Sequence, residues 1–247
     1  MRDFIKIFNK YQMEYQNICE ELKNSPEGRL MRRGNFFTQV IDNKEVGITN
    51  NIPLIKALCR KKYLEVRKKI LKQNLAATTR SKKFIDIKPE TIISGLPATY
   101  QGLPIHYFYH PSVEAFLAQG HSRNNYKPEN LHYHSNNGTL VRSKSETIIA
   151  NELEAYQIPY LYELPLKLGS QIKSPDFTTM CPFSGKIVLW EHYGALHLQE
   201  YEENMTNKML LYMKQGYQPF ETIIYTFEFD IKNIHRIREL IEQVILG

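Results

Sequence analysis

The order of hydrophobic patterns after residue 141 constrains the fold of this chain more than any other feature. Short apolar runs, rich in β-branched and aromatic residues, predict four strands, at 158–168, 173–180, 186–192 and 221–229. Amphipathic stretches predict helices before the first strand, between the third and the fourth, and after the fourth. The second half of the chain therefore predicts an α/β domain in the order α-β-β-β-α-β-α.

Helix start and stop signals support this order. Ser143 followed by Glu146 has the form of a capping box, with the serine as N-cap and the glutamate at N3, and predicts a helix to about residue 156. A second helix is predicted at 198–215 and ends at Gly216. Asp230 can cap a final helix that runs through residue 246.

The first 140 residues read as a mainly helical region with a small β-hairpin. Apolar residues at three- and four-residue steps predict a helix over 4–22, and two strands are expected on either side of Gly34. A basic helix is predicted over 53–75. Glycines and prolines predict short elements and loops over 76–140. We therefore expect two domains, 1–140 and 141–247.

Charge divides the two halves. Residues 1–140 hold 22 Lys and Arg against 12 Asp and Glu, whereas residues 141–247 hold 10 against 14. Such asymmetry favours an anionic partner for the first half, although a solvated basic helix face is the ordinary explanation. If the partner is a nucleic acid, the candidate phosphate contacts on the basic helix are Lys61, Lys62, Lys68 and Lys69.

Cysteine usage and hydropathy predict a cytoplasmic protein. The three cysteines, at 19, 59 and 181, form no CxxC pair and no disulfide framework, which fits a reducing compartment. No apolar run reaches about 18 residues, so no membrane-spanning helix is expected. The N-terminus lacks the pattern of a signal peptide.

Two short segments carry the candidate chemistry. Asp176 lies in Ser-Pro-Asp-Phe-Thr, and Glu191 lies in Leu-Trp-Glu-His-Tyr-Gly. The gap between them suits one β-hairpin, which would bring the two carboxylates together on adjacent strands. Such a pair suits a hard divalent cation such as Mg²⁺, and a cation held this way can activate water against a phosphodiester.

These segments, in this order of elements, resemble the PD-(D/E)xK nuclease superfamily, whose core is αβββαβ. The resemblance covers roughly residues 140–247, with Pro175 and Asp176 as the first half of the motif and Glu191 as its acidic position. The segment Glu-His-Tyr-Gly is similar to "EHxG" segments of nuclease modules attached to some helicases. The resemblance implies a restriction-endonuclease-like core and a Mg²⁺-dependent DNA endonuclease, with Mn²⁺ as a substitute and restriction or phage–host conflict as its setting. Many such nucleases act as homodimers.

The sequence departs from the superfamily pattern at the motif lysine. Two residues after Glu191 the chain has Tyr193, and a phenol cannot replace an ammonium at neutral pH. Some members carry this lysine on the following helix, where Lys208 is the candidate, two turns after Tyr201. A solvent-facing lysine on an amphipathic helix is the alternative.

Four other residues near the motif have both a functional and an ordinary explanation. Glu146 caps its helix or lies near the metal, and Glu163 is an active-site carboxylate or an edge-facing one. Arg142 and Lys144 hold phosphate or are exposed charges. His192 points to the strand face opposite Glu191, which favours a structural role.

Two further interpretations stay open. The missing motif lysine also fits a catalytically inactive DNA-binding protein with a nuclease fold. A third interpretation is an interaction protein that acts through protein contacts.

Overall fold

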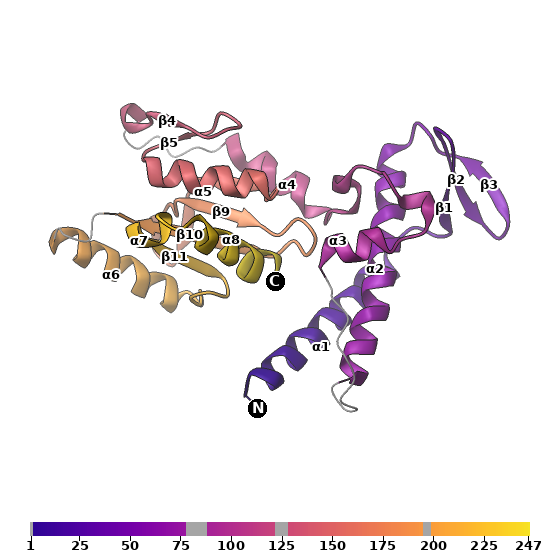
Figure 1. Ribbon diagram of the computed structural model, residues 1–247, viewed down its shortest axis with the longest axis horizontal. Helices are drawn as coiled ribbons and strands as arrows, with labels where there is room; N and C mark the ends of the chain where they lie inside the picture. The colour runs from indigo at the N-terminus through magenta and orange to yellow at the C-terminus, as the bar shows by residue number, and fades with distance from the viewer. Residues whose placement is uncertain (1, 78–87, 122–127, 195–198) are drawn as a thin grey trace. The chain divides into compact units, whose positions relative to one another are not determined.

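The chain forms two compact units (Figure 1). The computed structural model describes residues 2–77, 88–121, 128–194 and 199–247. These residues divide into an N-terminal unit, Met1–Tyr109, and a C-terminal unit, His110–Gly247. The boundary differs from the expected one at 140/141. Residues 110–140 belong to the second unit because β4 (Tyr133–His134) pairs with β5 (Leu140–Val141), which leads directly into the next helix.

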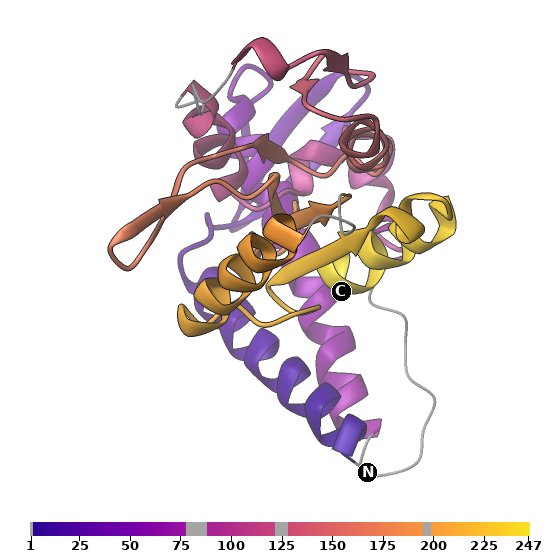
Figure 2. The ribbon, with the colours of Figure 1, turned by 90° about the vertical axis from the view of Figure 1, so that its left-hand side faces the viewer.

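Two long helices build most of the N-terminal unit. They are α1 (Arg2–Lys23) and α2 (Ile52–Ala77), which lie side by side in both views (Figures 1 and 2). Both confirm the helices predicted from apolar periodicity. The apolar face of α2 is fully buried at Ile55 and Leu71, and one cation of the same helix, Arg60, is buried as well in a salt bridge with Glu21 of α1.

A small antiparallel sheet completes this unit, in the order β1-β2-β3. The predicted hairpin is present as β1 (Arg29–Arg33) and β2 (Phe36–Ile41), and a third strand, β3 (Lys44–Gly47), extends it. The turn between β2 and β3 holds Asp42 and Asn43 at positive φ, as tight hairpin turns require. The remaining elements are short, as expected: α3 (Pro89–Ser94) and 3₁₀ turns at Ala98–Tyr100 and Ile105–Phe108.

The C-terminal unit is built on a four-stranded sheet in the order β11-β10-β9-β6. Three strands form an antiparallel meander: β6 (Tyr160–Tyr162), β9 (Phe177–Met180) and β10 (Ile187–Tyr193). The fourth, β11 (Ile223–Phe227), pairs with β10 in parallel because α6 (Gln199–Lys214) crosses over between them.

Helices cover both faces of this sheet (Figure 1). On one face lie α5 (Lys144–Ala155) and α8 (Ile234–Leu240), joined by an ion pair of Arg238 with Glu152. On the other face lies α6, which packs on the odd-numbered positions of β10. The buried core on this face consists of Leu168, Leu189, Tyr193, Tyr212, Ile223 and Tyr225. The other elements of this unit are α4 (Ser112–Ala118), the turns Gln119–His121 and Pro128–Asn130, α7 (Glu228–Ile231) and a π-helical segment, Ile241–Leu246.

The predicted strand at 158–168 is wrong, because the chain breaks after β6. Glu163 adopts φ of 48°, which no β-strand accommodates. The following residues form a separate hairpin of β7 (Leu166–Leu168) and β8 (Gln171–Lys173). The predicted strand at 173–180 is accordingly split, and its second part begins only at Phe177.

The final helix is also capped differently from the prediction. Asn233 is the N-cap of α8, where its side chain accepts a hydrogen bond from the backbone of His235. Asp230 instead lies in α7 and accepts from the backbone N–H of Phe227 at 2.9 Å. The strand β11 and α8 are therefore separated by a short extra helix.

In the part of the chain that the structure describes, no helix is both long enough and apolar enough to cross a membrane.

Candidate active site

The β9–β10 hairpin brings the two predicted carboxylates together. The strand pairing runs from Ile187 opposite Met180 to Trp190 opposite Phe177, and Glu191 and Asp176 come next on either strand. The backbone N–H of His192 donates to Oδ2 of Asp176 at 2.6 Å. The Asp176 carboxylate therefore lies against the end of β10, as the sequence predicted.

Glu191 is the most enclosed charged group of the site, with a residue exposure of 1%. Nζ of Lys208 donates to Oε2 of Glu191 at 2.7 Å, and the hydroxyl of Tyr212 donates to Oε1 at 2.6 Å. Lys208 also donates to the backbone carbonyl of Ser174, just before Asp176, at 3.1 Å. One ammonium thus connects Glu191 of β10 to the segment that leads into β9.

The ammonium that contacts Glu191 therefore comes from α6, the helix on which the candidate Lys208 was expected. Lys208 and Tyr212 are four residues apart, so both point from one helix face toward Glu191. The side chain of Tyr201, used to define that face in the sequence, lies outside the described side chains. Tyr193 is buried with its ring stacked against that of Tyr225, so it belongs to the core beneath α6.

Sequence reasoning missed Tyr212. Its only signal was the i, i+4 spacing from Lys208, because an apolar helix face ordinarily uses tyrosine for packing. In the structure the side chain is fully buried, and this burial, followed by the negative charge of Glu191, raises the pKa of its phenol. The neutral hydroxyl is therefore a permanent donor to Glu191.

Burial and like charge raise the pKa values of both carboxyl groups. For Asp176, burial is the larger cause and the neighbouring Glu191 the second, while Lys208 opposes them. For Glu191, burial raises the pKa and the ammonium of Lys208 partly offsets it. The carboxylate of Glu146 raises both pKa values further, so three acids and one ammonium share this site.

Glu146 both caps its helix and faces the site. Its backbone N–H donates to Oγ of Ser143 at 3.1 Å, which confirms Ser143 as the N-cap of α5. Its side chain accepts from the backbone N–H of Arg142 at 2.9 Å and from the hydroxyl of Tyr162 at 2.7 Å. The reciprocal bond of the predicted capping box is thus made one residue earlier than expected, to Arg142.

Glu163 is held by an arginine. Nε and Nη2 of Arg142 donate to its two carboxylate oxygens at 2.6 Å and 2.8 Å. This bidentate pair raises the pKa of Arg142, chiefly through the hydrogen bond itself. The structure therefore joins two predicted site residues to each other, whereas Lys144, the other predicted phosphate contact here, is exposed.

His192 lies on the sheet face opposite Glu191, as predicted. Its Nδ1 is 3.2 Å from Oγ1 of Thr226, and its Nε2 is 3.4 Å from Oε2 of Glu228. Burial lowers the pKa of His192, and the nearby carboxylate of Glu228 opposes that shift. The neutral imidazole therefore has a structural role, because it packs between Thr226 and Glu228 at the end of β10.

Most cations of the basic helix α2 have partners within the N-terminal unit. Nζ of Lys61 donates to the carbonyls of Pro26 and Gly28, both at 2.9 Å. Three other residues were predicted to contact phosphate. Lys62 forms a salt bridge with Glu65, and the ammonium of Lys68 lies over the ring of Tyr15. Lys69 is exposed.

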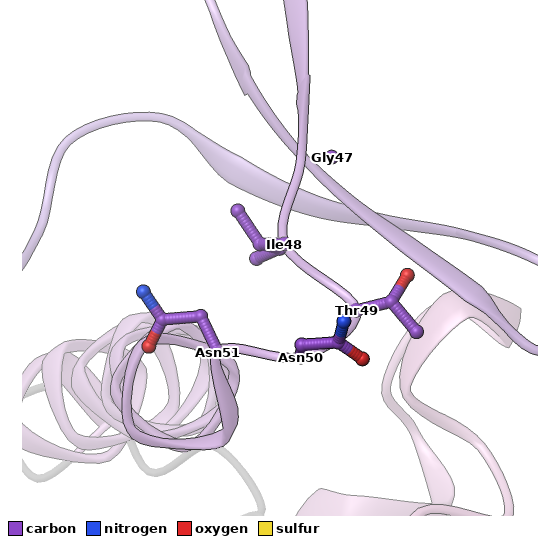
Figure 3. Close-up of a pocket in the computed structure, with 5 residues that line it drawn as sticks. All are labelled: Gly47, Ile48, Thr49, Asn50 and Asn51. Atoms are coloured by element: carbon purple, nitrogen blue, oxygen red, sulfur yellow. The ribbon is translucent and has the colours of Figure 1, made fainter.

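The N-terminal unit also has an open hollow beside the start of α2 (Figure 3). It is lined by residues Gly47, Ile48, Thr49, Asn50 and Asn51. Oγ1 of Thr49 accepts from the backbone of Phe37, and Oδ1 of Asn51 accepts from Leu54 at the helix start. These polar atoms hold the β3–α2 connection together, so the hollow offers no reactive group comparable to the carboxylates.

Comparison with known proteins yields one partial likeness. No family model matches the chain, and no solved structure matches it. A stretch of 86 residues is 35% identical to "Uncharacterized protein MJ1519" of Methanocaldococcus jannaschii. This similarity covers 33% of the present chain and 7% of that protein.

Proposed function

We propose that the C-terminal unit is a metal-dependent nuclease domain that hydrolyses phosphodiester bonds in DNA. The order α5, β6, β9, β10, α6, β11, with β11 parallel to β10, supports a restriction-endonuclease-like αβββαβ core. In this interpretation the hairpin of β7 and β8 is an insertion between the first two strands.

One observation carries the proposal. At the position of the motif lysine the chain has a core tyrosine, yet an ammonium reaches Glu191 from the following helix. Nζ of Lys208 lies 2.7 Å from the Glu191 carboxylate and also donates to the carbonyl of Ser174, in the segment that contains Asp176. A lysine that joins both motif carboxylate segments is what the superfamily's chemistry requires, whereas an ordinary surface lysine would not contact either.

The residues present fit a divalent cation. Within the described residues, no group of three or more His, Cys, Asp and Glu side chains is arranged as a metal site. Asp176 and Glu191 are nevertheless hard oxygen donors that are enclosed, adjacent and mutually repulsive, and a cation would relieve that repulsion. These two residues would hold Mg²⁺ or Mn²⁺, which supplies charge neutralisation and water activation when bound.

The chain's own groups would act around that cation. Lys208 would place positive charge beside the scissile phosphate, where negative charge builds in the transition state. Tyr212 would keep Glu191 oriented, because its buried hydroxyl donates to one carboxylate oxygen only. Glu146, held by Tyr162 and the backbone of Arg142, would add negative charge that favours cation binding.

A matched pair of variants tests the proposal. Asp176→Asn should reduce Mg²⁺- or Mn²⁺-dependent cleavage of plasmid, linear duplex, single-stranded and branched DNA by at least about 10³-fold, since a first cation ligand is lost. Asp230→Asn is the control, because Asp230 is a buried aspartate of the same unit whose carboxylate, like that of Asp176, accepts a backbone hydrogen bond. Cleavage by folded Asp176→Asn at the wild-type rate would contradict the assignment.

A second candidate is a nuclease-fold DNA-binding protein without activity. It is favoured by the hydrogen bonds of Glu191. Both carboxylate oxygens already accept a hydrogen bond from a side chain of α6, which leaves less room for a cation. Salt-dependent DNA binding without cleavage in either metal would support this candidate.

A further inference from the structure

At the end of β10, the backbone N–H of His192 is bonded to the Asp176 carboxylate, and the strand geometry explains why this N–H is available. Leu189 donates its N–H toward the β11 side, to the carbonyl of Thr222 at 3.0 Å. Because N–H groups alternate along a strand, the N–H of His192 points the opposite way, toward β9. The paired part of β9 begins only at Phe177, so this N–H extends past the last registered pair and donates to Asp176 at 2.6 Å.

This strand end therefore has a backbone partner on one side only. On that side His192 is in register with Thr226 of β11. The two side chains also meet, with Nδ1 of His192 3.2 Å from Oγ1 of Thr226. The indole N–H of Trp190 donates to the same hydroxyl oxygen at 2.9 Å. One fully buried threonine thus holds two side chains of β10 around Glu191.

The outer edge of the His192 ring faces a carboxylate. Nε2 is buried and lies 3.4 Å from Oε2 of Glu228, with no hydrogen-bond partner among the residues that the structure describes. Glu228 accepts from the hydroxyl of Ser145, in the first turn of α5, at 3.1 Å. The ring therefore lies between β11 and the start of α7, and the side chain has little freedom to rotate.

We propose that Thr226 and His192 are positioning residues that fix the Asp176 carboxylate for cation binding, by fixing the N–H to which it is bonded. The hydroxyl of Thr226 holds the ring, the ring holds the end of β10, and the N–H of His192 holds Oδ2 of Asp176. The cation-binding part of this inference rests on the proposed function. The orientation of Asp176 does not, because it concerns groups present in the chain.

The experiment uses near-isosteric variants of the full chain. Thr226→Val removes the hydroxyl with almost no change in shape, and Thr226→Ser restores it. Thr179→Val is the matched control, since Thr179 is also fully buried in this sheet and its hydroxyl donates to the carbonyl of Val188, at 2.7 Å. Asp176→Asn is the reference variant, because it shows the values that are expected when the charged acceptor is lost completely.

Two measurements are made on each variant. The first is the amide proton shift of His192 in protein labelled with ¹⁵N-histidine, because a short bond to a carboxylate moves this proton downfield. The second is the Mn²⁺ dissociation constant by calorimetry, without DNA. Thr226→Val should move the His192 amide upfield, toward its position in Asp176→Asn, and weaken Mn²⁺ binding by about 10-fold, as loss of outer support typically does.

The outcomes separate the two claims. Thr226→Ser should keep the wild-type amide shift and Mn²⁺ affinity, and Thr179→Val should lose stability without changing either. An unchanged His192 amide in Thr226→Val, or an equal change in Thr179→Val, would overturn the positioning role. If wild type binds no Mn²⁺, the proposed function fails, and the amide shifts still decide whether Thr226 orients Asp176.

Discussion

The two units treat buried charge in opposite ways. In the N-terminal unit, the guanidinium of Arg60 donates to both oxygens of Glu21 at 2.7 and 2.9 Å, and Arg67 is paired with Glu14. In the C-terminal unit, Asp176 and Glu191 are brought next to each other, and one ammonium, Lys208, is bonded to Glu191. Opposite charges join α1 to α2, whereas like charges gather at the end of the β9–β10 hairpin.

This difference separates charges that the fold pairs with opposite charges from carboxylates that lie close to one another. A cation enclosed with its own anion satisfies the fold and has little left to offer a ligand. Burial raises the pKa values of Asp176 and Glu191, and the charge of Glu191 raises that of Asp176 further, so positive charge near this pair is favourable. The acidic residues at the end of the β9–β10 hairpin, and not the basic helix, are therefore the group to which we assign the proposed cation.

The largest expected effect on stability lies in the N-terminal unit. Arg60→Met should lower the free energy of unfolding by about 3 kcal/mol, because Glu21 would keep its charge without its partner. Chemical denaturation followed by circular dichroism measures this change. Lys69→Met, at an exposed position of the same helix, should leave the free energy of unfolding unchanged. Equal losses of stability in both variants would contradict the structural role of the buried pair.

Loss of Lys208 should reduce activity and stability together. Lys208→Met keeps the apolar stem but should lower cleavage by about 10²-fold, because positive charge at the transition state is lost. It should also destabilise the protein by about 1–3 kcal/mol, since Glu191 would keep only its bond from Tyr212. Lys214→Met, at the exposed end of α6, is the control for both assays. A wild-type rate in Lys208→Met would remove the lysine from the mechanism.

The raised pKa of Asp176 predicts an unusual pH dependence of stability without metal. Its folded-state pKa lies above the unfolded value, so the folded protein binds this proton more tightly. The contribution is favourable below a pH of about 4 and is lost as pH rises through the folded pKa. The difference in melting temperature between wild type and Asp176→Asn should therefore shift in favour of the variant as pH increases.

Added Mg²⁺ should reverse this shift in wild type and leave Asp176→Asn unaffected. A difference between the two proteins that stays constant with pH would contradict the raised pKa.

The smallest effect concerns DNA affinity. Lys69→Ala should reduce the slope of log affinity against log salt by about 1 if this exposed ammonium meets a phosphate. Lys61→Ala should leave that slope unchanged and instead lower stability, because its ammonium already bonds two backbone carbonyls. Fluorescence anisotropy over a salt series compares the two variants. Equal slopes in wild type and both variants would place DNA binding elsewhere.

Local signals allowed much of the fold to be predicted. The helices α1, α2, α5 and α6 and the strand β10 lie close to their predicted ranges, because each carries its own apolar periodicity and end signals. The strand break at Glu163 and the cap at Asn233 were not foreseen. No local sequence pattern indicates a left-handed residue between two strand-like runs, or an extra turn of helix after β11.

By itself, the sequence determined which carboxylates would meet, since a hairpin places Asp176 and Glu191 on neighbouring strands through short-range geometry. The resemblance to the nuclease superfamily also named Lys208, since some members carry the lysine on the helix that follows the motif strand. Only the tertiary structure decided what each charge meets: Glu163 meets Arg142, and Lys61 meets backbone carbonyls. Tyr212 and Thr226 emerged only there as well, because partners from other elements determine whether a buried hydroxyl packs or holds a charged group in place.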